Sequence, residues 1–127
     1  WRSAERTKEV KRLAYTLQTF IHHKVFGNYL SKCKPLAYRK EDWLHLTRGR
    51  ERSVRLIVRA MLGVPSAHLG PHEHAMWCFQ FPKGSLLTVH LHRGTVAEIS
   101  TYEADKDELE EAVDYLLEEV AARLRQL

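Results

Sequence analysis

The fold is decided by residues 74–101, which read HAMWCFQFPKGSLLTVHLHRGTVAEIST. Trp77, Phe79 and Phe81 alternate with smaller or more polar residues, a pattern typical of a strand with one buried face. Pro82-Lys83-Gly84 follows and predicts a three-residue hairpin loop, because proline suits the first turn position and glycine tolerates a positive φ. The stretch therefore predicts an antiparallel hairpin.

The length of this loop sets the register of the hairpin. If Phe81 pairs with Ser85, the large apolar side chains of both strands fall on the same face. A two-residue turn would instead place Leu87, Val89 and Leu91 on the face opposite the aromatic side chains. We therefore expect the first register.

A second turn at Arg93-Gly94 indicates a third strand over 95–101, with Ala97, Ile99 and Thr101 inward. Residues 74–101 are thus interpreted as a three-stranded antiparallel meander with uncapped edges. Its outer face is expected to stay open or to meet a partner, and it carries Met76, Cys78, Gln80, Thr88, His90 and Val96.

Helical periodicity dominates on both sides of the sheet. Residues 105–127 predict an acidic amphipathic helix that starts with a capping box at Asp105 and Glu108. Its apolar stripe comprises Leu109, Ala112, Val113, Leu116, Leu117, Val120, Ala121, Leu124 and Leu127.

The first half, 3–62, predicts basic helices. The pattern indicates a long helix over 3–30, a short turn over 41–46, and a helix over 51–62 that ends at Gly63.

The expected fold class is α+β: N-terminal helices packed with a C-terminal helix on one face of a three-stranded antiparallel meander. A length of 127 residues, 44% hydrophobic and 28% charged, suits a single domain over 1–127. Because position 1 is Trp1, the chain is interpreted as a fragment of a longer protein. The lack of a long apolar run and of a cysteine framework favours an intracellular location, cytoplasm or nucleus, without membrane contact.

Charge is distributed unevenly along the chain. Residues 1–60 contain 15 Lys and Arg and 5 acidic residues, whereas 61–127 contain 5 and 11. This asymmetry predicts a basic face that meets an anion. The competing interpretation is that the two halves neutralise each other in the fold.

The basic half predicts binding to a nucleic-acid backbone, RNA or DNA, because arginine suits bidentate phosphate contacts. Trp43 is interpreted as a core anchor and Tyr38 as an exposed aromatic that stacks on bases. The candidate interface comprises Lys32, Lys34, Tyr38, Arg39, Lys40, Arg48, Arg50, Arg52, Arg55 and Arg59.

Other chemistry has weaker support in the sequence. His74, His90 and His92 would share the outer sheet face and are weak candidates for zinc, although cysteine-rich ligand spacing is missing. No catalytic motif is present, so neither an enzyme nor a cofactor is expected.

The alternative function is a protein-interaction or dimerisation module of a larger assembly. It would use the outer sheet face and the C-terminal helix, with a homodimer as one form.

The layout of basic helix, sheet and closing helix resembles that of the tombusvirus silencing suppressors. Matches occur at Ser53-Val54 and at Arg59 through Gly63. The resemblance implies a dimer that clasps small duplex RNA.

Overall fold

The structure is a computed structural model that describes residues 31–63, 67–69, 74–91 and 96–127. The helix expected over 3–30 lies outside the described residues. The described elements are, in chain order, β1 (Lys34–Pro35), α3 (Lys40–Thr47), α4 (Glu51–Leu62), β2 (Ala67–Leu69), β3 (His74–Gln80), β4 (Leu86–Leu91), β5 (Glu98–Tyr102) and α5 (Lys106–Arg125).

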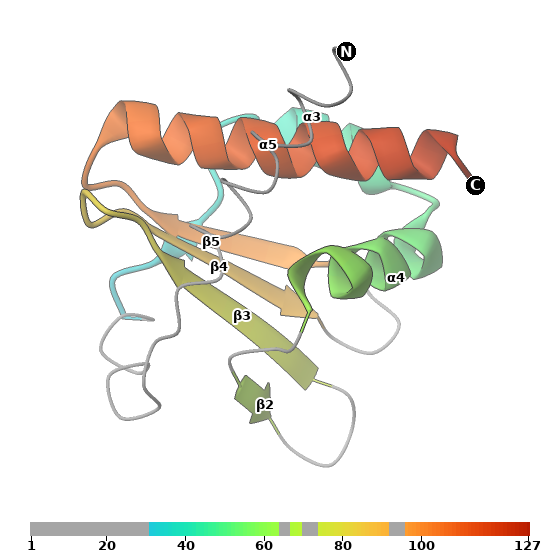
Figure 1. Ribbon diagram of the computed structural model, residues 1–127, viewed down its shortest axis with the longest axis horizontal. Coiled ribbons are helices and arrows are strands. Elements are labelled where there is room, and N and C mark those ends of the chain that lie inside the picture. Colours follow the sequence, from blue (N-terminus) through green and yellow to red (C-terminus); the bar gives the residue numbers. More distant parts are fainter. Residues whose placement is uncertain (1–30, 64–66, 70–73, 92–95) are drawn as a thin grey trace, which may run out of the picture.

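The strands form one antiparallel sheet in the order β1-β5-β4-β3-β2 (Figure 1). The α+β class is confirmed, but the expectation of three strands with uncapped edges is wrong. The short strands β1 and β2 pair with the outer edges of β5 and β3. Neither is long enough to show an alternating pattern, and Pro35 is tolerated because β1 lies at the edge of the sheet.

The predicted hairpin register is confirmed. The amide of Phe81 donates to the carbonyl of Ser85 at 2.9 Å, and Trp77 pairs with Val89. Gly84 has a φ of 98°, the positive value that the three-residue loop requires. The aromatic residues of β3 therefore share the face of β4 that carries its inward apolar side chains.

Helices α3, α4 and α5 cover this aromatic face of the sheet (Figure 1). The helix predicted over 51–62 is α4, and it buries Val54, Ile57, Val58 and Leu62. Trp43 of α3 is 4% exposed, and its indole N–H donates to the carbonyl of Ala97 at 3.2 Å. Trp43 is therefore the core anchor that its sequence context predicts.

Helix α5 is fixed at its start to the β3–β4 hairpin. The Asp105 side chain accepts from the amide of Glu108 at 2.9 Å. The Glu108 carboxylate accepts from the amide of Lys83 at 2.9 and 3.1 Å. Asp105 is thus the capping residue, as predicted. The Glu108 side chain, however, accepts hydrogen bonds from the hairpin loop and not from the backbone at the start of the helix.

The outer face of the sheet is not open, contrary to expectation. Met76, Cys78 and Thr88 are 6%, 0% and 3% exposed. The Sγ atom of Cys33, just before β1, lies 3.7 Å from the hydroxyl of Thr88, so this segment contacts the outer face. An apolar strand surface is stabilised by such burial.

No helix within the described ranges is both long and apolar enough to span a membrane.

Candidate nucleic-acid interface

Helix α4 places part of the arginine cluster on an exposed face. Its apolar residues face the core, so Arg52, Leu56 and Arg59, at spacings of four and three, face away from it. Leu56 is 62% exposed, which is high for leucine. Arg48 and Arg50 precede the helix and are exposed as well.

These arginines have no acidic partner in the part of the chain that the structure describes. Of the arginines in the described ranges, only Arg39 and Arg123 lie within 4.0 Å of a carboxylate. The acidic side chains of α5 pair elsewhere: Asp114 binds Arg39, and Glu119 binds Arg123 at 3.0 Å. The interpretation that the two charged halves neutralise each other is therefore not realised at α4.

Arg55 differs from its neighbours on α4. Its side chain is partly buried, and its Nη1 atom is buried without a hydrogen-bond partner. We therefore exclude Arg55 from the exposed surface.

Tyr38 and Arg39 are held within the fold. The Tyr38 hydroxyl donates to the Asp114 carboxylate at 3.1 Å. Arg39 donates to Asp114 and to Asp42, each at 2.9 Å. Partial burial and the Asp114 carboxylate raise the pKa of Tyr38, and hydrogen bonds to Asp42 and Asp114 raise the pKa of Arg39. Both side chains are thus engaged by hydrogen bonds within the fold, and stacking of Tyr38 on bases stays a prediction.

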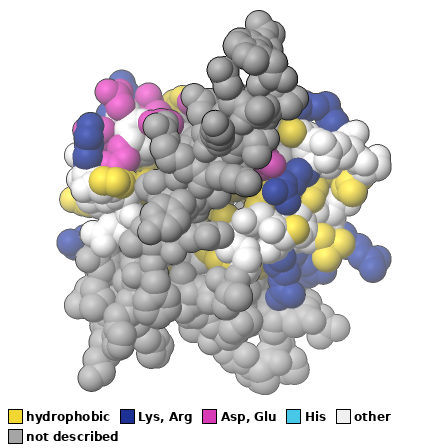
Figure 2. Space-filling view, viewed as in Figure 1, with side chains coloured by type: hydrophobic (Ala, Val, Ile, Leu, Met, Phe, Trp, Pro, Cys, Tyr) yellow, Lys and Arg dark blue, Asp and Glu magenta, His cyan; other side chains and the backbone are white. Residues whose placement is uncertain are grey.

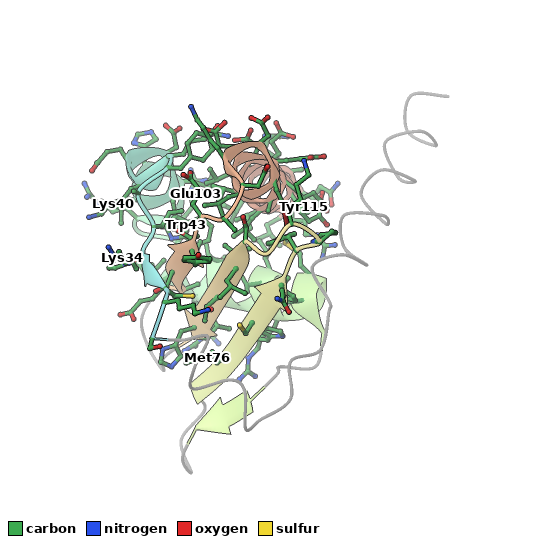
Figure 3. The ribbon with its side chains drawn as sticks, turned by 90° about the vertical axis from the view of Figure 1, so that its left-hand side faces the viewer. Lys34, Lys40, Trp43, Met76, Glu103 and Tyr115 are labelled. Atoms are coloured by element: carbon green, nitrogen blue, oxygen red, sulfur yellow. The ribbon has the colours of Figure 1, made fainter. Side chains whose placement is uncertain are left out.

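The predicted lysines lie along β1 and at the start of α3. Lys32, Lys34 and Lys40 are exposed, and Figure 3 shows Lys34 and Lys40 on the same side of the molecule. The ammonium of Lys32 lies 5.9 Å from the ring centre of Tyr102, which is 37% exposed. Tyr102 is thus an exposed aromatic residue beside lysines. It lies on the outer side of β5, and no pattern in the sequence indicated this position.

Arg125 joins the arginines of α4 although it is distant in sequence. It is exposed at the end of α5 and lines a pocket of about 350 Å³ with Arg50, Ser53, Leu124 and Leu127. In the sequence, the helix dipole is enough to explain an arginine at the end of this helix. Arg125 was therefore not predicted as part of the interface. Only the packing of α4 against α5 brings it to Arg50.

We define the arginine surface as five exposed arginines that have no carboxylate partner among the described residues: Arg48, Arg50, Arg52, Arg59 and Arg125. Figure 2 shows Lys and Arg side chains on the right of the view, where α4 and the end of α5 lie, and Asp and Glu side chains mainly at the upper left, with some Lys and Arg beside them. Among the described residues, most acidic side chains in this view therefore lie away from the arginine surface.

The histidine hypothesis is largely outside the described residues. His92 and the side chain of His74 are not described, and His90 is partly buried on the outer face. The described residues contain no group of three or more side chains placed to hold a metal ion. Burial raises the pKa of both Cys33 and Cys78, which disfavours their reactive thiolate forms.

Comparisons with protein-family models, curated proteins and solved structures found no match. The resemblance to the tombusvirus suppressors therefore stays a prediction from layout and short matches.

Proposed function

We propose that this chain is a nucleic-acid-binding domain that contacts phosphates through the arginine surface. The observation that carries the proposal is that these five arginines are exposed and lack carboxylate partners among the described residues. An unpaired guanidinium keeps its full charge for an external anion, and its planar donors match two phosphate oxygens.

The dimensions of α4 support contact with a polyanion rather than with a single charge. Arg52 and Arg59 are seven residues apart, about 10 Å along a helix. A duplex carries one phosphate charge per roughly 1.7 Å of its axis, so a face of this length meets several phosphates. Leu56 lies between the two arginines and offers an apolar contact to a sugar.

RNA is proposed ahead of DNA, and this preference rests on the layout that the chain shares with the tombusvirus suppressors. The lysines of β1 and α3 form a second basic area, and Tyr102 adds an aromatic side chain beside it. The proposal assigns phosphate contacts first to the arginine surface and only secondarily to these lysines.

Charge reversal tests the proposal. The double variant Arg52→Glu/Arg59→Glu is expected to weaken binding to duplex RNA by at least about tenfold and to flatten the salt dependence by about two phosphate contacts. Both side chains are exposed, so the free energy of unfolding should change by less than about 0.5 kcal/mol. Fluorescence anisotropy at several salt concentrations and urea denaturation measure the two effects.

The matched control is Lys83→Glu/Lys106→Glu, which changes the net charge equally. These lysines are 67% and 73% exposed and lie at the acidic end of α5. The control should bind more tightly than the arginine variant. Equal losses in the two folded variants would mean that net charge alone drives binding, and the assigned surface would be wrong.

The alternative, a protein-interaction or dimerisation module, has less support, because much of the surface assigned to it is buried. Met76, Cys78 and Thr88 of the outer face are buried, as is the apolar stripe of α5 from Leu109 to Val120. If no nucleic acid binds, the arginine surface with Leu56 becomes the place to seek an acidic protein partner.

A further inference from the structure

We propose that the pocket between the start of α4 and the end of α5 binds the phosphorylated end of a nucleic-acid strand. The ligand is a terminal phosphomonoester together with its nucleoside. The inference rests on the proposed function and extends it, because it adds recognition of a strand end to contact with the backbone.

The pocket is built by two segments that are far apart in the sequence. Arg50 directly precedes α4, and Arg125 is the last residue of α5. Packing of α4 against α5 brings these side chains to one opening, which is also lined by Ser53, Leu124 and Leu127. Arginines from the start of α4 and the end of α5 therefore line the same pocket.

The charge of the pocket suits a phosphomonoester better than a backbone phosphate. A phosphomonoester carries about −1.5 to −2 at pH 7, whereas a backbone phosphodiester carries a single negative charge. Arg50 and Arg125 both lack a carboxylate partner within 4.0 Å in the described part of the chain, so two positive charges are available. The Ser53 hydroxyl supplies a further donor.

The helix start itself does not supply the site. The Glu51 carboxylate accepts from the amide of Gly49 at 3.0 Å, and backbone hydrogen bonds lower the pKa of Glu51. This carboxylate already fulfils the anionic role at the start of α4. Recognition therefore depends on the arginine side chains rather than on the helix dipole.

The remaining lining suits a nucleoside. Leu124 and Leu127 give the pocket an apolar side, and Leu127 is 81% exposed. Base and sugar faces pack on such surfaces, and each base offers a flat π-face. The volume of about 350 Å³ lies near the lower limit for small-molecule sites, about 300 Å³, which fits one nucleotide rather than a longer segment.

The test compares one RNA strand in three forms: with a 5′-phosphate, with a 3′-phosphate, and with hydroxyls at both ends. The full chain is titrated with each by fluorescence anisotropy at fixed salt. We expect one phosphorylated form to bind about tenfold more tightly than the hydroxyl form, since two charged donors contact the added phosphate. Competition with adenosine monophosphate shows whether a free nucleotide competes for the same pocket.

Variants assign the preference to the pocket. Arg125→Gln should reduce the ratio of affinities for phosphorylated and hydroxyl RNA to about one, and Arg50→Gln should reduce it strongly. The control Arg59→Gln lies on α4 outside the pocket. It should weaken binding of both RNA forms and keep their ratio.

Equal affinity of the wild-type chain for all three forms would overturn the inference and leave the proposed function standing. A preference that survives in Arg125→Gln would overturn it too. If no RNA form binds, the proposed function fails, and adenosine monophosphate binding then decides the pocket. If adenosine monophosphate binds to the wild-type chain and not to Arg125→Gln, the result would support a nucleotide site in the pocket. If adenosine monophosphate does not bind, the result would refute the site.

Discussion

At the scale of single residues, sequence context identifies core anchors better than it identifies exposed side chains. Trp43 lies between Asp42 and Leu44, and its predicted burial is correct. Tyr38 lies between Ala37 and Arg39 and is only partly exposed, and Asp114, 76 positions away, accepts the hydrogen bond of its hydroxyl. Partners that distant leave no local pattern.

The contact between Tyr38 and Asp114 predicts a measurable titration. Partial burial and the Asp114 carboxylate raise the pKa of Tyr38. Asp114→Asn removes the negative charge that disfavours the phenolate, so the pKa of Tyr38 should fall toward the ordinary tyrosine value of about 10. Titration of ¹³C-labelled tyrosine by NMR measures the shift.

The control for this titration is Asp107→Asn, an exposed acidic residue in the first turn of α5. It should leave the Tyr38 resonance unchanged. An equal shift in the two variants would show that the general charge of α5, and not the Asp114 contact, sets the pKa.

At the scale of elements, periodicity predicts long segments and misses short ones. The hairpin, its register and the bounds of α4 follow from the sequence, because each depends on local patterns and turn residues. The edge strands β1 and β2 have two and three residues, too few for any period. Burial of the outer sheet face was missed because contacts such as Cys33 with Thr88 join distant segments.

Thiol reactivity tests the burial of the outer face. Cys78 is fully buried on β3 and Cys33 is partly exposed, and burial raises the pKa of both thiols. With a chromogenic disulfide reagent at pH 7, Cys33 should react more slowly than a free thiol, and Cys78 should react only when the chain unfolds.

The variant Cys33→Ser isolates the thiol of Cys78, and the same protein in denaturant gives the rate for full exposure. An open outer face would make Cys78 of the native variant react as fast as the denatured chain. That outcome would contradict the packing of this side of the sheet.

At the scale of the whole molecule, the basic half of the sequence predicted a single anion-binding face. The structure divides the basic residues that it describes in this half among three places. Arg48, Arg50, Arg52 and Arg59 lie at α4, the lysines lie at β1 and α3, and Arg39 is neutralised by Asp42 and Asp114.

The sequence predicts those residues of the candidate site whose exposure follows from their spacing along a helix. Arg52 and Arg59 face outward because α4 is amphipathic, and this follows from the sequence. Arg125 could not be assigned to the same surface, because its proximity to Arg50 depends on the packing of α4 against α5. Arg55 stands apart from this surface because its Nη1 atom is buried, which its spacing in the sequence does not indicate.

The most direct test of the central claim is the salt dependence of binding to duplex RNA, single-stranded RNA and duplex DNA. The five arginines of the arginine surface predict a slope of log Kobs against log salt of about −3.5 to −4.5 for the preferred probe, the smaller magnitude for a single strand and the larger for a duplex. This slope should be measured by fluorescence anisotropy from about 50 to 300 mM salt. Binding with a slope in that range would support phosphate contacts by several unpaired arginines. No binding to any of the three probes at the lowest salt, or binding with a slope near zero, would contradict the account.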